Sequence, residues 1–279
     1  MIKRVGIVGL GLMGASFGRV LVKNGYEVYG ADKSDAVMQK ALLAGAYTEP
    51  LNEKTAAKVD LLVVAIFPRA FEAAARQYLP FLKKGAIVSD FCGNKRIVAK
   101  AMRALSAERD DVTFVGGHPM AGREYSGVEH SSVRLFDGAS MILVPVTEDL
   151  FALSELKKFY LSLGFGEVVV TTPEQHDKMI SYTSQLCHVV SNAFIKSESA
   201  KAHGGYSAGS YRDLTRVARL NPDMWAELMM DNRDYLKGEL DGLIRSLQAY
   251  SDALGKGEED KLRDLLAEGD RIKREIDKR

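Results

Sequence analysis

The chain has 279 residues and a mass of 30.7 kDa, enough for one large domain or two ordinary ones with a sizeable core. Hydrophobic residues make up 46% and charged residues 27%, a composition that excludes an intrinsically disordered chain. The 38 basic and 37 acidic residues nearly cancel, which argues against binding to nucleic acid through many phosphate contacts.

Cysteine content and hydropathy exclude several other classes of protein. Cys92 and Cys187 are too few for a disulfide framework, and they are not spaced as a C-x-x-C metal or redox motif. The N-terminus, MIKRVGIVG, lacks the pattern of a signal peptide, and every apolar run is far shorter than the ~20 residues of a membrane helix. We therefore expect a cytoplasmic protein that binds no structural metal and does not associate with a membrane.

The first half of the chain alternates short apolar runs with helical stretches. We expect strands at 4–8, 26–30, 60–66, 86–89, 112–115, 140–146 and 167–170. Helices are expected between them, ending near residue 24 and then at 34–44, 69–79, 96–105 and 148–163, with Ser34 as an N-cap. The unbroken apolar run at 60–66 is typical of a strand buried on both faces of a sheet. This alternation predicts βαβ units and a parallel sheet.

The pattern changes at Thr172-Pro173, where β-branched runs cease and helical periodicity begins. Helices are expected at 175–200, 224–254 and 260–277, with a glycine-rich stretch at 203–210 between the first two. The mixed charges of the last segment are typical of a solvated helix face. We therefore divide the chain into an α/β domain, residues 1–172, and an all-helical domain, residues 173–279.

A glycine motif lies between the first expected strand and the first expected helix. It fits G-x-G-x-x-G and comprises Gly9, Leu10, Gly11, Leu12, Met13 and Gly14. In this context the glycines allow a tight turn, close approach to a pyrophosphate, and close helix–strand packing. Asp32 ends the second expected strand, where a carboxylate hydrogen-bonds ribose hydroxyls and repels a 2′-phosphate. The segment predicts a Rossmann-type dinucleotide site that favours NAD over NADP.

A histidine marks the candidate reaction centre. His118 lies in GGHPMAG, which we place just after the strand at 112–115, at the sheet edge where such folds bind ligands. A neutral imidazole, with a reference pKa near 6.5, suits the proton acceptor that oxidation of an alcohol requires. We interpret His130, His176 and His203 as structural or exposed.

Four segments in order resemble the prephenate/arogenate dehydrogenase family of tyrosine biosynthesis. They are GLGLMG, GGHPMAG, HDKMISYTSQLCH and YRDLTRVARLNPDMW, and the resemblance covers almost the whole chain. It implies oxidative decarboxylation of a cyclohexadienol, with hydride transfer to NAD and loss of carbon dioxide. It also implies a homodimer formed by the helical domain.

The same resemblance implies roles for particular residues. His118 matches the family's catalytic histidine, and Arg216 matches an arginine that holds a substrate carboxylate. Further matches to the substrate region are Ser184, His188, Glu124, Asp177 and Trp225, of which the two acids would lie near the arginine. Read from its surroundings alone, His188 fits a core position as well as a ligand contact, and Trp225 fits the core equally well.

The chain departs from the family pattern beside the expected site. Gly93 stands where the family commonly has a serine that is associated with the histidine and the substrate hydroxyl, and Asn94 or a water could substitute for it. Gln185 and Cys187 replace a histidine and a proline of the family's S-H-L-P-H segment. We interpret Cys92 as a free, buried or half-buried thiol, because nothing near it in the sequence marks it as a nucleophile.

Two other functions are compatible with the glycine motif. One is a two-domain dehydrogenase of the β-hydroxyacid or pyrroline-carboxylate reductase kind, although the catalytic-lysine pattern of the β-hydroxyacid enzymes is absent from the sequence. The other is a non-catalytic NAD-binding regulator, which would need neither His118 nor Arg216. The sequence does not separate prephenate from arogenate or from an amino analogue of prephenate, nor does it settle inhibition by tyrosine.

Overall fold

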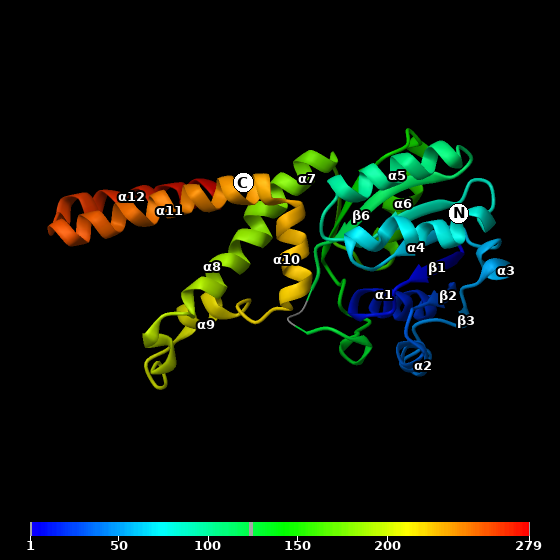
Figure 1. Cartoon of the computed structure of the whole chain (residues 1–279), viewed down its shortest axis with the longest axis horizontal. Coiled ribbons are helices and arrows are strands. Elements are labelled where there is room, and N and C mark those ends of the chain that lie inside the picture. The colour runs from blue at the N-terminus through cyan, green and yellow to red at the C-terminus, as the bar shows by residue number, and fades with distance from the viewer. Residues whose placement is uncertain (1, 123–124, 279) are drawn as a thin grey trace.

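The computed structural model describes residues 2–122 and 125–278, and within them the strands form one eight-stranded sheet of order β3-β2-β1-β4-β5-β6-β7-β8. The strands are β1 (Arg4–Val8), β2 (Glu27–Ala31), β3 (Glu49–Pro50), β4 (Leu61–Val64), β5 (Ile87–Asp90), β6 (Thr113–Pro119), β7 (Ser140–Pro145) and β8 (Glu167–Val170). Figure 1 shows the sheet and its helices on one side and the C-terminal helices reaching away from it.

Helices cover both faces of the sheet, so the central strands lie between two hydrophobic cores. One core packs the sheet against α1 (Leu12–Lys23), α2 (Asp35–Leu43) and α6 (Leu150–Ser162). The other packs it against α3 (Glu53–Ala56), α4 (Phe71–Tyr78) and α5 (Arg96–Glu108). All four residues of β4 are fully buried, which confirms the prediction from the run at 60–66. The expected α/β sheet domain followed by helices is confirmed.

Strand β6 differs most from the prediction. The sequence places a strand at 112–115 and a loop at GGHPMAG, but β6 continues through His118 to Pro119. It pairs antiparallel with β7, with His118 opposite Ile142, so the expectation of a wholly parallel sheet is wrong at this pair. The sequence pattern does not predict this part of the strand, because Gly116 and Gly117 have a low β propensity. Here a glycine is required, since a Cβ on Gly117 would lie 2.6 Å from the carbonyl oxygen of Asp90. The short edge strand β3 is also missing from the prediction.

The helical part begins with a nearly continuous rod. It consists of α7 (Pro173–Ile180), a π-helical segment (Ser181–Leu186) and α8 (Cys187–Phe194). Then follow α9 (Gly209–Thr215), α10 (Pro222–Asp231), α11 (Arg233–Lys256) and α12 (Glu259–Ile276). Short 3-10 turns lie at Pro68–Ala70, Leu79–Phe81, Val128–His130 and Glu198–Lys201. Helices α11 and α12 form a hairpin that projects from the molecule (Figure 1).

The single helix expected at 224–254 is two helices. The chain breaks at Asn232, whose backbone lies at φ −118° and ψ 21° and whose side chain is fully buried. Apolar periodicity continues on both sides of the break, so the pattern alone does not show it. Among residues 2–122 and 125–278, no helix is long and apolar enough to cross a membrane, and no cluster of three His, Cys, Asp or Glu residues could hold a metal ion.

Candidate active site

The glycine motif forms the turn between β1 and α1. Gly9 has φ +91°, a conformation that favours glycine, and a Cβ on Gly14 would lie 1.8 Å from the carbonyl oxygen of Gly9. A Cβ on Gly11 would meet no atom within 4 Å, so the space over this residue is open. Gly9 and Gly14 therefore shape the turn, while Gly11 leaves room for a ligand to approach the backbone.

The start of α1 and the end of β2 fit a dinucleotide. The N-cap Gly11 has no side chain to cap α1, which leaves N–H groups at that terminus for a pyrophosphate. Asp32 follows β2 directly, and its carboxylate accepts hydrogen bonds from the N–H groups of Leu10 (2.9 Å) and Ser34 (3.0 Å). These bonds fix the carboxylate beside the glycine turn, where ribose hydroxyls would lie.

His118 stands near the carboxyl end of β6 and forms one end of a buried chain of polar groups. Its Nδ1 lies 2.9 Å from Nε2 of His176, and Nδ1 of His176 lies 2.7 Å from a carboxylate oxygen of Asp177. His176 and Asp177 are 2% and 1% exposed. This row of three side chains connects β6 to α7, and so links the sheet to the first helix of the helical part.

Asp177 also fixes the start of α5. Helix α5 has no capping side chain of its own, and the N–H groups of Lys95 and Arg96 donate to Asp177 at 2.7 and 2.9 Å. Burial raises the pKa of Asp177, but the bonds from His176, Lys95 and Arg96 outweigh it and the pKa is lowered. Asp177 is therefore a carboxylate at neutral pH.

Both imidazoles are neutral at the same pH. Burial lowers the pKa of His118 well below its ordinary 6.5, and His176 and Lys95 add to the shift. Burial likewise lowers the pKa of His176, although Asp177 partly opposes it. An uncharged His118 is the form able to accept a proton.

A buried ion pair underlies β6. Lys95 and Asp90 are 1% and 0% exposed, and the Lys95 ammonium contacts the Asp90 carboxylate and donates to the carbonyl oxygen of Gly117 at 2.6 Å. The other carboxylate oxygen of Asp90 accepts from the Gly117 N–H at 3.0 Å. These bonds fix the backbone next to His118.

Three buried amides connect the sheet to the helices. Gln185 donates to the side-chain oxygen of Asn94 at 3.1 Å, and Asn232 donates to Gln185 at 2.9 Å. Asn94 donates to the backbone oxygen of Leu228 at 2.8 Å. The amide of Asn94 is thus used within this cluster, which does not support the suggestion that it replaces the missing serine beside His118.

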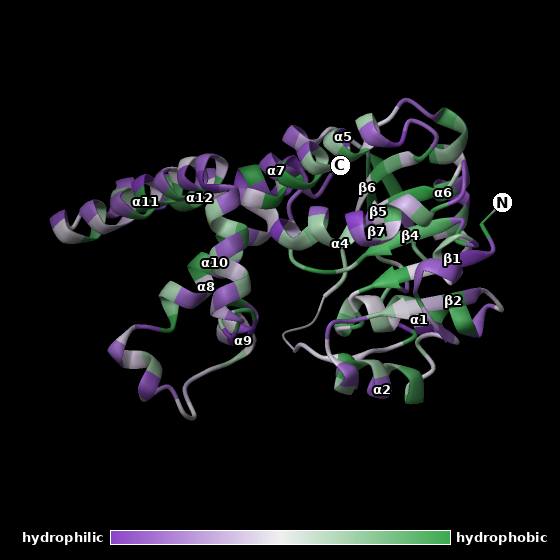
Figure 2. Cartoon of the chain, turned by 45° about the vertical axis from the view of Figure 1, so that its right-hand side comes forward, coloured by the Kyte–Doolittle hydropathy of each residue, from purple (hydrophilic) through white to green (hydrophobic). Residues whose placement is uncertain are grey.

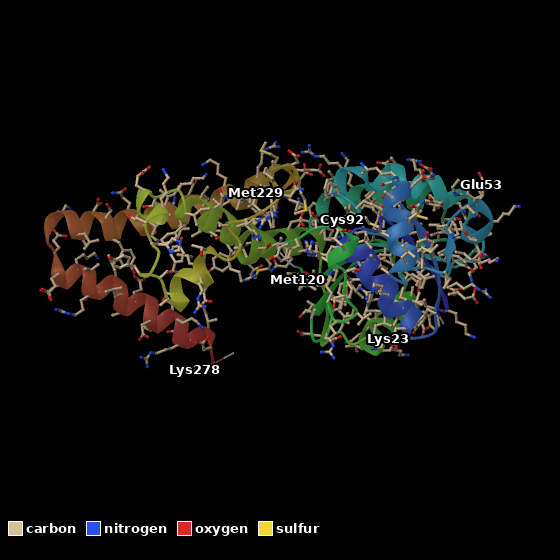
Figure 3. The ribbon with its side chains drawn as sticks, turned by 90° about the horizontal axis from the view of Figure 1, so that it is seen from below. Lys23, Glu53, Cys92, Met120, Met229 and Lys278 are labelled. Carbon is tan, nitrogen blue, oxygen red and sulfur yellow. The ribbon has the colours of Figure 1, made fainter. Side chains whose placement is uncertain are left out.

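A leucine side chain restricts the space for a side chain at Gly93, the position of that missing serine. A Cβ on Gly93 would lie 3.1 Å from Cδ2 of Leu228, which reaches across from α10. Figure 3 labels Cys92 and Met120 on the sheet part and Met229 on α10, on the two sides of the junction between the sheet and the helices. Cys92 is buried, and its Sγ contacts the carbonyl oxygen of Ile66 at 3.2 Å. Burial raises the pKa of this thiol well above its ordinary value, as expected for an unreactive cysteine.

Most of the expected substrate residues lie on the helical part. His188 stacks on Trp225 with ring centroids 3.7 Å apart, and its Nδ1 lies 2.9 Å from the backbone oxygen of Ser184. Arg216 is exposed and directly follows α9. Asn192 of α8 donates to the backbone oxygen of Ala218 at 3.1 Å and so ties the arginine's segment to the helix that carries His188. Glu124 lies outside the described residues.

Three residues beside His118 were not predicted as site residues. His176 was interpreted as structural or exposed, and Asp90 and Lys95 were not singled out. A signal was present for His176, because it precedes Asp177 in the HD pair of a recognised motif. For Asp90 and Lys95 the signal was weaker: Asp90 directly follows an expected strand, and Lys95 comes five residues after it.

The doubly covered sheet, the glycine turn and the neutral histidine define a dinucleotide-dependent dehydrogenase. The family described as "Prephenate dehydrogenase, nucleotide-binding domain" matches residues 17–178, and "Prephenate dehydrogenase, dimerization domain" matches residues 172–268. The chain belongs to the prephenate dehydrogenase family.

Individual relatives agree with this assignment. The cyclohexadienyl dehydrogenase of Zymomonas mobilis is 28% identical, over 97% of this chain and 95% of its own. Prephenate dehydrogenase from A. aeolicus, solved with hydroxyphenyl propionate and NAD+, is 28% identical with a TM-score of 0.84, over 99% of each chain. Synechocystis arogenate dehydrogenase is 26% identical with a TM-score of 0.79, over 97% of this chain and 99% of its own.

The two other functions considered from the sequence are not favoured. A 3-hydroxyisobutyrate dehydrogenase from Mycobacterium tuberculosis is 17% identical with a TM-score of 0.54, over 77% of this chain and 70% of its own, a likeness of fold alone. A non-catalytic regulator does not require the His118–His176–Asp177 chain, and the similar proteins reported above are dehydrogenases.

Proposed function

We propose that the protein oxidatively decarboxylates prephenate to 4-hydroxyphenylpyruvate, or arogenate to tyrosine, with hydride transfer to NAD. The observation that carries this proposal is the neutral, partly buried His118 near the carboxyl end of β6. The glycine turn after β1 belongs to the same edge, because β1, β4, β5 and β6 are parallel neighbours. A substrate bound over the nicotinamide would therefore meet this histidine.

In this reaction the bound nicotinamide supplies the hydride acceptor. His118 takes the proton of the ring hydroxyl through Nε2, since its Nδ1 faces His176. The guanidinium of Arg216 holds a substrate carboxylate by forked hydrogen bonds. Ser184, His188 and Trp225 line the substrate site, and Asp177 supports it from α7. Glu124, outside the described residues, retains its proposed place near the arginine.

NAD is the preferred cofactor in this proposal. Gly9, Leu10, Gly11, Leu12, Met13 and Gly14 supply the turn and the helix terminus for the pyrophosphate. The carboxylate of Asp32 would bond the ribose and repel the 2′-phosphate of NADP. Comparing Kd for the two cofactors tests this. Asp32→Asn should narrow the preference for NAD, and equal affinity for both cofactors in the wild-type protein would contradict it.

The helical region, residues 173–279, assembles a homodimer in this proposal, and residues 1–172 bind the dinucleotide. Its support is the dimerization-domain match and a set of large apolar side chains exposed on these helices: Met230, Ile244, Leu247, Leu254, Leu266 and Ile276. Figure 2 shows hydrophobic segments among the hydrophilic ones along this region. The cytoplasmic location stays a prediction.

The deciding experiment follows the near-ultraviolet absorbance of reduced nicotinamide with prephenate or arogenate and NAD or NADP. Reduction with one combination identifies substrate and cofactor together. His118→Asn is the matched control. It should bind NAD as the wild-type protein does and lose about 100- to 10,000-fold in turnover, the usual contribution of a general base. A wild-type protein that binds NAD and oxidises neither substrate would refute the proposal.

A further inference from the structure

His176 is buried behind the proposed base and touches it directly. Its ring contacts His118 on one side and Asp177 on the other, through Nε2 and Nδ1. Asp177 is fixed in turn by the N–H groups of Lys95 and Arg96 and by the guanidinium of Arg96 at 3.3 Å. Burying the polar ring of His176 is costly unless both of its nitrogens are hydrogen-bonded, and both are in contact with these partners.

The hydrogen-bonding roles along this chain follow from its charged end. The carboxylate of Asp177 only accepts, so Nδ1 of His176 must carry a proton. A neutral His176 then has a bare Nε2, which accepts a hydrogen bond from Nδ1–H of His118. The neutral His118 is left with a bare Nε2. That nitrogen is the one required to receive a substrate proton.

We propose that His176, held by Asp177, is a positioning residue that fixes the neutral tautomer of His118 with its proton on Nδ1. The role deepens the proposed function and rests on it where His118 is the base. When Nε2 of His118 accepts the hydroxyl proton, the ring becomes an imidazolium with a proton on each nitrogen. The carboxylate of Asp177, one imidazole away, stabilises that charge through the hydrogen-bonded chain.

Two variants of equal side-chain length test the role through kinetics. Gln in His176→Gln can present an amide oxygen to His118 and preserve the acceptor, whereas Met in His176→Met fills similar space without one. We expect kcat of the glutamine variant to stay within about tenfold of wild type and kcat of the methionine variant to fall about 100-fold or more, with KM and NAD affinity little changed in both. Equal losses in both variants, or none in either, would overturn the role.

A spectroscopic measurement on the wild-type protein needs no substrate and no substitution at His176. In protein labelled with 15N-histidine, the chemical shift of a bare imidazole nitrogen differs strongly from that of a protonated one, and His118→Asn assigns the signals. We expect Nδ1–H and a bare Nε2 at His118 at neutral pH. A proton on Nε2 of His118 refutes the positioning role of His176, whether or not the protein oxidises prephenate or arogenate. If His118 carries its proton on Nδ1 but the protein oxidises neither substrate, the positioning role of His176 stands and only the proposed function is refuted.

Discussion

The pKa of His118 is lowered by burial and, in smaller part, by His176 and Lys95. His176 differs, because the carboxylate of Asp177 partly offsets the effect of burial on its pKa. The proposed base is thus kept uncharged by its surroundings, while the carboxylate stands one ring further away. This separation keeps the base free of a proton in the resting protein and still leaves a negative charge near the imidazolium formed during the reaction.

The lowered pKa predicts the acid side of the pH profile. A histidine base is inactive once protonated, so kcat/KM falls as pH drops through the pKa of His118 in the free enzyme. Because that pKa lies well below 6.5, activity should persist below pH 6.5. Steady-state kcat/KM measured across the acid range checks this. Loss of activity centred at or above pH 6.5 would show that His118 is not the group that titrates.

Gly93 gives a second prediction at the residue scale. A Cβ there would lie 3.1 Å from Cδ2 of Leu228, so Gly93→Ser should cost about 1 kcal/mol through overpacking. In a Leu228→Ala background the added side chain has room, and the cost should largely disappear. Urea unfolding of the two single variants and the double variant measures the coupling. An equal cost of Gly93→Ser in both backgrounds would show that Leu228 does not limit this position.

At the scale of elements, the break between α10 and α11 has a clear physical cause. The buried Asn232 donates to the carbonyl oxygen of Asp177 at 2.8 Å and to Gln185 at 2.9 Å, and it accepts from Arg96 at 2.9 Å. The side chain thereby joins α5, α7, the π-helical segment and α11. Interrupting one long helix places an amide where these elements meet, beside the carboxylate that orients His176.

Removing this amide should destabilise the protein. Asn232→Ala leaves the buried side-chain oxygen of Gln185 without its hydrogen-bond donor and removes one of the two bonds to the Asp177 carbonyl oxygen, which keeps the Ser181 N–H. We expect a loss of about 2 kcal/mol in the free energy of unfolding. Asn221→Ala is the matched control, since Asn221 is exposed and caps only α10, a bond worth about 1 kcal/mol. Denaturant titration compares the two. A smaller loss at Asn232 than at Asn221 would contradict this account of the break.

The sequence predicts elements well where local pattern and tertiary environment agree. The run at 60–66 and the glycine turn at 9–14 show this, because burial and tight turning leave direct marks on residue choice. It fails where a distant contact decides the structure. Position 117 in strand β6 holds a glycine because the backbone of Asp90 leaves no space for a side chain. Helix α10 ends at Asn232, where the Asn232 amide meets Asp177 and Gln185. The contact of His176 with His118 was not predicted for the same reason, since the two residues lie 58 positions apart in the sequence.

At the scale of the whole molecule, the helices after residue 173 leave several large apolar side chains exposed. Helices α11 and α12 project from the sheet part as a hairpin, braced by the Tyr250 hydroxyl, which donates to the carbonyl oxygen of Leu265 at 3.1 Å (Figure 1). Ile244 and Leu247 stand three positions apart on α11 and are 53% and 58% exposed. A second copy of the chain would cover this surface in the proposed homodimer.

Charge on that surface should therefore dissociate the proposed dimer. Leu247→Glu puts a carboxylate where an apolar contact with the partner would form, and burying an unpaired charge is costly. We expect sedimentation velocity to show a dimer for the wild-type protein and a shift toward monomer for the variant. Leu150→Glu is the matched control, because Leu150 is 83% exposed at the start of α6, on the sheet part and away from the hairpin of α11 and α12 (Figure 1). A Leu247→Glu protein that sediments as the wild-type dimer would place the interface on another face of these helices, and a monomeric wild type would refute the dimer itself.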